Sequence, residues 1–478
     1  MKKRASGVLM HVSSLPGDYS VGSFGGGAYK FIDFLADAGF SYWQVLPFCM
    51  PDECGSPYKS KGSFSVNPWF IDLPILKKQG LITDSELDSA RQHSPYLSEY
   101  ARLPERMSLL RRAAERVTDR ERVEEFIATN GELSYTARYL AIAEEQGDIP
   151  HRLWRDVQPS ADTLFFHKFL IYEFCKQWQG VKSYANSRGI SVIGDMPIYA
   201  AYESADVWAR PEAFLLDGEL LPRSVAGVPP DYFAKEGQLW GNPLYNWRGM
   251  RERGFDFFRA RMENALSLFD GVRIDHFRAL DAYYSIPSAA LTAKEGKWIK
   301  GPGRALVRAL RDLTKNKLVI AEDLGDITDS VRDLVRYSGY PGMRVLQFGF
   351  MGEENSIHLP HNYTETSFAY TGTHDNNTLL GFIWESDSVT RARIFDYFGI
   401  RHNDWSLACE DIIRCLLASS ARAVILPVQD LLGFGADTRM NTPGVPDGNW
   451  RFRITEDNLR TLSENSGKYR YLNNLYGR

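Results

Sequence analysis

The sequence has few cysteines, little net charge and no long apolar run, and each shortage excludes a class of protein. Its 478 residues include five cysteines without metal-ligand spacing, which indicates reduced thiols and a cytoplasmic protein. A net charge of −4 offers no basic surface for nucleic acid. No run reaches membrane-spanning length. The apolar residues 7–10 are too few for a signal peptide, so we expect no such segment.

Aromatic residues, in contrast, are abundant. The chain has 11 Trp, 24 Tyr and 27 Phe, and many of them will belong to the core. Sugars present flat C–H faces ringed by hydroxyls, which suit aromatic platforms beside polar side chains. The excess of aromatic residues therefore favours a carbohydrate ligand.

Short apolar runs alternate with amphipathic helical patterns along the whole chain, which is typical of a parallel sheet with helical crossovers. The pattern predicts eight strands, at residues 8–12, 42–46, 190–195, 269–275, 318–321, 344–348, 368–371 and 423–426. We expect an α/β fold, a single (β/α)8 barrel over residues 1–478. Two insertions interrupt it after the second and third strands: a helical subdomain at 81–158 and an active-site loop subdomain at 197–250.

Four of the predicted strands end on a carboxylate. Asp195, Asp275, Glu322 and Asp375 follow the third, fourth, fifth and seventh strands. Any one of them could be a helix N-cap. All eight strands of a barrel end at one mouth, however, and acidic residues there are typical of catalysis. Four together therefore predict an active site.

Residues 271–278 (GVRIDHFR) place Arg273 and Asp275 on the same face of a strand. A nearby guanidinium lowers the pKa of a carboxyl and keeps it ionised, as a nucleophile requires. The pair could equally be a structural ion pair. If Asp275 is the nucleophile, Glu322 suits the acid, because a neighbouring ionised carboxylate raises its pKa. Asp375, with His374 beside it, would then bind sugar hydroxyls.

Other chemistries lack their signatures. The chain has no Cys/His cluster for zinc, no phosphate-binding glycine loop and no nucleophile elbow. A metal site built from His276, His374 and Asp375 lacks the spacing of ligands on a helix or hairpin. We therefore expect no metal and no cofactor, and glycosyl chemistry through paired carboxylates.

Several motifs carry a family resemblance, and together they span nearly the whole chain. They are residues 11–17 (HVSSLPG), 194–199 (GDMPIY), 240–245 (WGNPLY), 271–278, 321–325 (AEDLG), 372–376 (GTHDN), 439–444 (RMNTPG) and 448–450 (GNW). The sequence resembles the short form of the 4-α-glucanotransferases (amylomaltase or disproportionating enzyme), in the α-amylase clan. Asp18, Ala279 and Phe452 depart from the family motifs, and none is one of the three catalytic candidates.

The resemblance implies transfer of α-1,4-glucan segments from a maltooligosaccharide or starch-type donor to the 4-hydroxyl of a glucan or glucose, through a covalent glucosyl-enzyme intermediate. It assigns Asp275 as nucleophile, Glu322 as acid/base and Asp375 as transition-state stabiliser. Nine further residues are implied at the sugar subsites: Ser56, Tyr58, Asp195, Asp231, Gln238, Trp240, Arg273, His374 and Asn441. Tyr58 and Trp240 would be stacking platforms, with core packing as the alternative for each.

Two other functions remain open at this level. A hydrolase of the same clan would use the same carboxylates with water as acceptor, and the loops that exclude water decide between the two. A non-catalytic glucan-binding barrel would need no intact carboxylates at three strand ends. The sequence favours the transferase.

Overall fold

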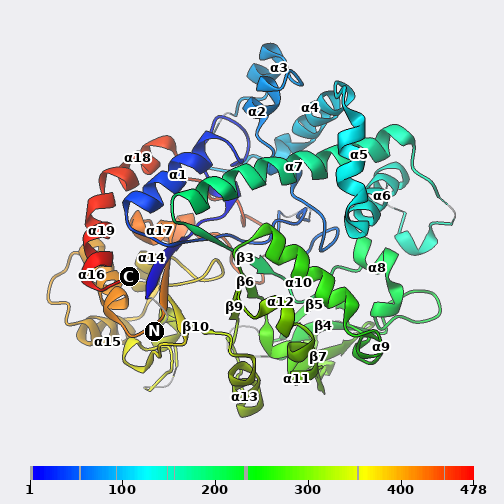
Figure 1. Ribbon diagram of the computed structural model, residues 1–478. Helices are drawn as coiled ribbons and strands as arrows, with labels where there is room; N and C mark the ends of the chain where they lie inside the picture. The colour runs from blue at the N-terminus through cyan, green and yellow to red at the C-terminus, as the bar shows by residue number, and fades with distance from the viewer. Residues whose placement is uncertain are drawn as a thin grey trace.

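The computed structural model describes residues 4–52, 55–92, 94–147, 149–155, 157–230, 235–352, 355–445 and 447–478. Its centre is a closed barrel of eight parallel strands (Figure 1). The barrel strands are β1 (Ala5–Leu9), β2 (Tyr42–Gln44), β3 (Ser191–Met196), β6 (Gly271–Ile274), β9 (Leu318–Ala321), β10 (Gly342–Val345), β11 (Ser367–Tyr370) and β12 (Ala423–Pro427). Each strand lies beside its neighbour in the chain order, and β12 pairs with β1 to close the ring. The expected (β/α)8 barrel is confirmed.

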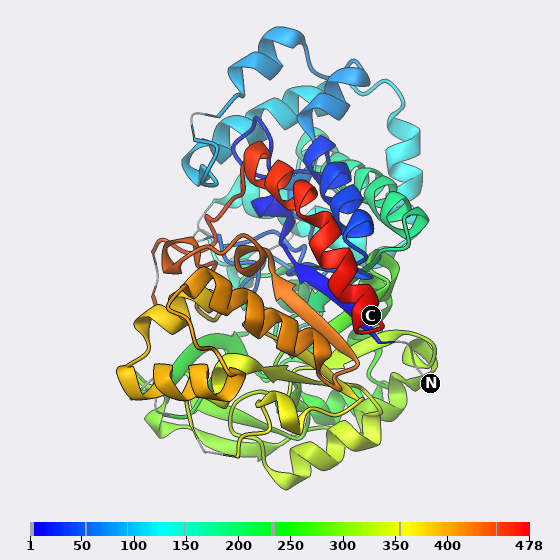
Figure 2. The ribbon, with the colours of Figure 1, turned by 90° about the vertical axis from the view of Figure 1, so that its left-hand side faces the viewer.

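Helices surround the barrel. They are α1 (Gly26–Asp37), α7 (Ala161–Ser187), α10 (Asp256–Leu268), α11 (Arg304–Ala309), α12 (Arg311–Thr314), α13 (Asp329–Ser338), α14 (Leu379–Glu385), α15 (Ser388–Phe398), α16 (Trp405–Ala418), α17 (Val428–Leu431), α18 (Glu456–Glu464) and α19 (Ser466–Leu475). The last two pack against α1, so the end of the chain covers its beginning (Figure 2). None of the helices within the described ranges is long and apolar enough to cross a membrane.

Much of the aromatic content is structural. Trp43 on β2 and Trp178 on α7 are fully buried, and their rings contact each other. The Trp178 ring also contacts Phe24 and Phe48. Each indole N–H is satisfied, Trp43 by the carbonyl of Met10 at 2.8 Å and Trp178 by that of Leu268 at 2.8 Å. Buried aromatic rings with paired polar atoms stabilise the barrel wall, and they do not by themselves indicate a ligand.

Several α-helices lie in the chain between β2 and α7 (Figure 1). They are α2 (Leu73–Lys78), α3 (Asp84–Ser89), α4 (Leu103–Glu115), α5 (Arg120–Ala128) and α6 (Gly131–Gln146). Pro104 lies in the first turn of α4, where its missing N–H costs no hydrogen bond. Both α5 and α6 pack against α7, so this helical segment rests on the barrel's own helix.

The segment after β3 differs from the expected long loop. It contains α8 (Ala205–Ala209), α9 (Trp247–Glu252) and two strands, β4 (Ser224–Val228) and β5 (Gln238–Pro243). These strands form an antiparallel sheet with β7 (Ala282–Pro287) and β8 (Lys297–Lys300), in the order β5-β4-β7-β8. Glycine and proline weaken the strand signal of β4 and β5. The pairing of β4 with β7, which lies beyond Asp275 in the chain, is a tertiary contact that local patterning does not reveal.

Two helical segments are interrupted, and one predicted strand boundary moved. Residues 247–268 form two helices, α9 and α10, because Gly254 and Phe255 have φ angles of +68° and +61° and break the helical path. Residues 304–314 likewise form two helices, α11 and α12. The first strand occupies residues 5–9 rather than 8–12, because Val12–Ser14 form a 3-10 turn.

Candidate active site

The sequence-predicted carboxylates meet at one mouth of the barrel. Asp195 is in β3, while Asp275 and Glu322 come directly after β6 and β9. The backbone segments that follow β6 and β9 remain hydrogen-bonded to each other. The Glu322 N–H donates to the carbonyl of Ile274, and the Phe277 N–H donates to the carbonyl of Glu322, each at 3.1 Å. The positions of Asp275 and Glu322 are therefore fixed by backbone geometry.

Arg273 holds the centre of the site. Its side chain is only 5% exposed and contacts three carboxylates. One terminal nitrogen bonds Asp195; the other, Nη2, donates to Asp275 at 2.9 Å and lies 3.2 Å from Glu322. A buried guanidinium is stable only when its charge is compensated in this way.

The contact of one nitrogen with two carboxyl groups limits their separation. Oδ1 of Asp275 and Oε2 of Glu322 lie 2.9 and 3.2 Å from the same atom, so they are no farther apart than these lengths added together. That bound falls below the separation of about 6.5–9.5 Å found in inverting glycosidases. The bound on these two oxygens thus favours a retaining over an inverting mechanism.

Burial raises the pKa of Asp275 to about 7, and the charge of Glu322 adds to this effect while Arg273 opposes it. We expected Arg273 to lower this pKa. It acts in that direction, but the loss of solvent outweighs it. At neutral pH the Asp275 carboxyl is therefore close to its titration midpoint, and attack on a substrate requires its ionised form.

Asp375 is held by a second set of contacts. Its Oδ2 lies 3.2 Å from Nε2 of His374, and its Oδ1 accepts a hydrogen bond from the Asn441 amide at 2.6 Å. Burial alone would raise the pKa of Asp375, but the charge and hydrogen bond of His374 and the Asn441 amide lower it to about 2. The same contact raises the pKa of His374 against its own burial. The two form an ion pair at the mouth.

Aromatic rings join the two halves of the site. Tyr58 donates its hydroxyl to Asp195 at 2.7 Å, and its ring stacks on His374 with centroids 5.1 Å apart. Trp450 contacts both rings, at 6.0 Å from Tyr58 and 5.9 Å from His374. Tyr58 is thus part of the polar network as well as a ring at the mouth, and it is not simply core.

The remaining sequence-predicted residues lie on the rim or outside the described part. Trp240 packs edge-on against His276 at 5.0 Å, and its indole N–H donates to Gln238 at 3.0 Å. Ser56 accepts a hydrogen bond from the Tyr58 N–H at 3.4 Å and supports the turn that carries this tyrosine. Asp231 lies outside the described residues.

Two residues at the site, His276 and Arg439, were given no role in the reaction from the sequence. His276 has a left-handed backbone (φ +46°), which directs its N–H to Oε2 of Glu322. Its Nε2 is buried and has no hydrogen-bond partner among the described residues. Arg439 donates to the carbonyl of Asp375. Both lie inside the quoted motifs, but only the fold shows which atoms they reach.

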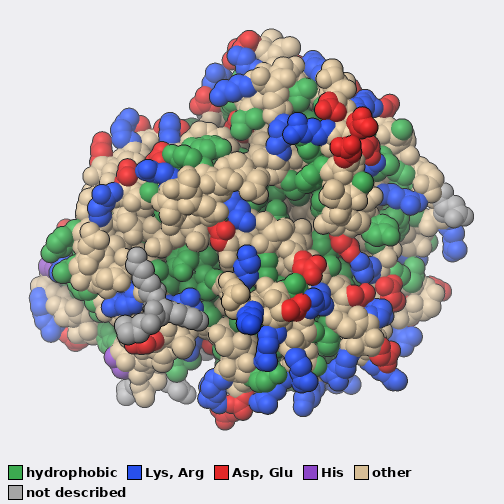
Figure 3. All heavy atoms as spheres, viewed as in Figure 1, with side chains coloured by type: hydrophobic (Ala, Val, Ile, Leu, Met, Phe, Trp, Pro, Cys, Tyr) green, Lys and Arg blue, Asp and Glu red, His purple; other side chains and the backbone are tan. Residues whose placement is uncertain are grey.

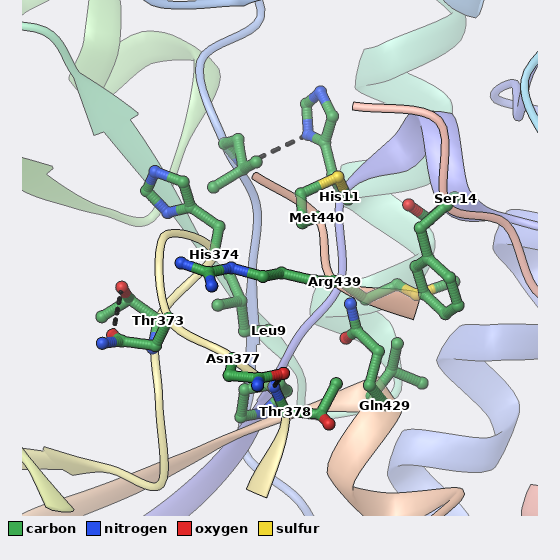
Figure 4. Close-up of a pocket in the computed structure, with 16 residues that line it drawn as sticks. Leu9, His11, Ser14, Thr373, His374, Asn377, Thr378, Gln429, Arg439 and Met440 are labelled. Carbon is green, nitrogen blue, oxygen red and sulfur yellow. Dashed lines mark hydrogen bonds between the residues drawn. The ribbon is translucent and has the colours of Figure 1, made fainter. Parts of the chain in front are cut away.

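A small cavity adjoins this site between the ends of β1, β11 and β12. Thr373, His374, Gln429 and Arg439 line it, and the Arg439 side chain extends across it toward His374 (Figure 4). His11 lies on the opposite wall; burial and the nearby charge of His374 lower its pKa to about 3. Its Nδ1 accepts a hydrogen bond from the Leu46 N–H at 3.2 Å. Because His11 is neutral, it does not repel the positive charge of His374, which pairs with Asp375.

A (β/α)8 barrel whose mouth carries two neighbouring carboxyl groups and a third ionised one has an arrangement typical of enzymes that act on glycosidic bonds. Comparisons with known proteins specify the class further. The sequence profile of the family described as 4-alpha-glucanotransferase matches residues 10–459. The 4-alpha-glucanotransferase of Aquifex aeolicus is 42% identical over 95% of this chain and 96% of its own. That of Thermus thermophilus is 39% identical, also over 95% and 96%.

Solved structures agree. The amylomaltase of Streptococcus agalactiae, determined in complex with acarbose, superposes with a TM-score of 0.95 at 35% identity over the whole of both chains. The amylomaltase of Corynebacterium glutamicum shares the fold, with a TM-score of 0.80 at 18% identity over 99% of this chain and 75% of that one. The protein therefore belongs to the 4-alpha-glucanotransferase family. It is an enzyme that transfers α-1,4-glucan segments from a donor to an acceptor glucan.

Proposed function

We propose that Asp275 and Glu322 perform this transfer by double displacement. The observation that carries the proposal is the shared contact of both carboxyl groups with one nitrogen of Arg273. Each of the two carboxyl groups has one oxygen with a partner among the described residues. Oδ1 of Asp275 and Oε2 of Glu322 make hydrogen bonds or ion pairs, and the other oxygen of each group makes none with these residues. Oδ2 of Asp275 is then free to attack, and Oε1 of Glu322 is free to carry the proton.

In the first step, Oδ2 of Asp275 bonds to the anomeric carbon while the bond from that carbon to the leaving O4 breaks. Glu322 gives its proton to O4, and the shortened glucan leaves. In the second step, the 4-hydroxyl of an acceptor gives its proton to Glu322 and bonds to the anomeric carbon, which releases Asp275. One glycosidic bond is broken and one is formed, so the number of reducing ends stays constant.

Asp375 stabilises the flattened sugar ring in this proposal. Two neighbours already bond its oxygens, but each carboxylate oxygen has a second lone pair for a sugar hydroxyl. Because His374 and Asn441 keep it ionised, its hydrogen bonds to the sugar are charge-assisted. Bonds that strengthen as the ring flattens lower the barrier.

The subsites follow from the same residues. Oδ1 of Asp195 is buried without a partner among the described residues, and a sugar hydroxyl would supply one. Trp240 and Gln238 form the rim at which an acceptor would bind, beside His276. Ser56 and Asp231 are assigned to the subsites by family resemblance, as are Tyr58 and Arg273.

Incubation with maltotriose tests the reaction. Transfer produces glucose and a ladder of longer glucans with a constant reducing-end count. A rising count without longer products would show a hydrolase and refute the proposal. Glucose is proposed as an acceptor: labelled glucose added with maltoheptaose should enter the oligosaccharides at their reducing ends.

The cytoplasm is the proposed location. The four cysteines in the described part of the chain, at positions 49, 175, 409 and 415, are free thiols, which suits a reducing compartment. Fractionation of the producing cell should recover the activity with cytoplasmic markers, and recovery outside the cell would contradict the proposal.

A further inference from the structure

An open groove lies beside α14 and the start of α16, and none of the four carboxylates of the active site lines it. Its volume is about 600 Å³, within the range of sites that hold organic ligands. Leu380 and Trp384 of α14 form one wall, Asn403 to Ser406 form another, and Gly435 closes the end. The helices α14, α15 and α16 lie together on the left of Figure 1.

Two indole rings dominate the groove. Trp384 is 68% exposed, the most exposed tryptophan in the described part of the chain. Its ring centroid lies 4.8 Å from that of Trp405, at an interplanar angle of 59°. Water contact with so large an apolar surface is costly, and a folded protein seldom leaves an indole open without a use.

The rings are also held in place. The Arg391 guanidinium lies over the Trp405 ring at 4.9 Å. The same side chain donates to the carbonyls of Ile383 at 3.0 Å and Trp384 at 2.9 Å, which ties the end of α14 to α15. A platform ordered before binding loses little entropy when a ligand arrives.

Polar groups surround the platform. Among the residues that the structure describes, neither the Asn403 amide nor the Ser406 hydroxyl has a hydrogen-bond partner, and both side chains are exposed. Asp404 caps α16 by accepting from the Leu407 N–H at 3.0 Å, and its second oxygen remains open. Indole faces bordered by neutral donors and acceptors suit a pyranose ring, which has an apolar face and equatorial hydroxyls.

Charge argues against an anionic partner. Asp404 lies in the groove itself, and Arg391 is occupied by Trp405 and by backbone carbonyls. On the face shown in Figure 3, acidic and basic side chains are interspersed, in keeping with the net charge of −4. A neutral polysaccharide fits a groove of this composition.

Position links the groove to the reaction. The loop that carries His374 and Asp375 continues directly into α14. Gly435 begins the segment that supplies Arg439 and Asn441 to Asp375. The Asn377 amide also donates to Glu385 at the end of α14, at 2.8 Å. The groove therefore borders the two segments that hold Asp375.

We propose that this groove is a second binding site for α-1,4-glucan, distinct from the catalytic mouth, with Trp384 and Trp405 as its stacking surface. It holds a polymeric substrate at the enzyme without taking part in bond cleavage. A long glucan gains from two contacts because binding at one site raises its effective concentration at the other. A trisaccharide is too short to gain in this way.

Retention in native gels that contain soluble amylopectin tests the proposal. All proteins carry Asp275→Asn, which prevents turnover of the gel polymer. Adding Trp384→Ala should weaken apparent affinity for amylopectin at least threefold, and Asn403→Ala should weaken it less. Tyr471→Ala removes a ring that is 61% exposed on α19 and does not line the groove, and it should leave retention unchanged.

In otherwise wild-type protein, Trp384→Ala should lower the ratio of kcat/KM on amylopectin to kcat/KM on maltotriose at least threefold. Thermal unfolding checks that the exposed position leaves the fold intact. Unchanged retention and an unchanged ratio, or an equal loss for Tyr471→Ala, would overturn the second site. Failure of the wild-type enzyme to rearrange maltotriose would instead count against the proposed reaction, so the two failures are distinguishable.

Discussion

Replacing Arg273 with glutamine tests the electrostatics of the site most directly. The substitution removes a positive charge that contacts Asp195, Asp275 and Glu322 from a side chain that is 5% exposed. Breaking a buried ion pair by removing one partner costs about 3–5 kcal/mol of stability. We expect the free energy of unfolding to fall by about that amount at pH 7, as measured by urea denaturation.

Activity should fall for a related reason. A neighbouring guanidinium lowers a carboxyl pKa by about 1–3. The pKa of Asp275 is already about 7 with Arg273 present, so without Arg273 only about 10⁻¹ to 10⁻³ of the molecules would be ionised at pH 7. Because about half of the wild-type molecules are ionised at pH 7, we expect kcat/KM on maltotriose to fall about 5–500-fold and to recover as the pH is raised.

Stability should respond to pH in the opposite direction to activity, and fall as the pH is raised. A carboxyl whose pKa is higher in the folded than in the unfolded state binds more protons when folded, so stability falls as pH rises between the two values. The variant should therefore lose most stability, relative to wild type, at alkaline pH. Arg401→Gln is the matched control, because Arg401 is 74% exposed and, among the described residues, pairs only with the equally exposed Asp396. An acidic limb of kcat/KM that does not move in Arg273→Gln would refute the reasoning.

Three other predictions concern single contacts. Asp275→Asn should reduce turnover at least about 10⁴-fold while glucan binding persists in a gel-retention assay; appreciable residual activity would show that Asp275 is not the nucleophile. Asn441→Ala removes a 2.6 Å bond to the Asp375 carboxylate and should raise the activation free energy by about 1.5–3 kcal/mol, measured as kcat/KM, with unchanged kinetics as the contrary result. At His276, glycine accepts the left-handed backbone and keeps the N–H on Glu322, whereas valine strains it. His276→Gly should therefore retain more activity and about 1–2 kcal/mol more stability than His276→Val, and the reverse order would exclude a backbone role.

The sequence by itself determined the barrel and the main chemistry. The alternation of apolar strands with amphipathic helices requires a parallel sheet, and carboxylates at four strand ends must then meet at one edge. The spacing of Arg273 and Asp275 also sufficed to place them on one face of a strand. These inferences agree with the structure because they depend on the local periodicity of apolar residues, which can be read from the sequence without knowledge of tertiary contacts.

The tertiary structure decided the remainder. The sheet of β4, β5, β7 and β8 forms from strands that Asp275 separates in the chain, so no local pattern could reveal it. The raised pKa of Asp275 likewise depends on burial and on Glu322, which come from packing and outweigh the neighbouring Arg273 that the sequence displays. His276 directs its backbone N–H to Glu322 because φ is +46°, and Trp384 is 68% exposed because the described residues packed around α14 leave most of its side chain uncovered. Burial and long-range pairing are properties of the assembled fold, and they decide what each residue can do.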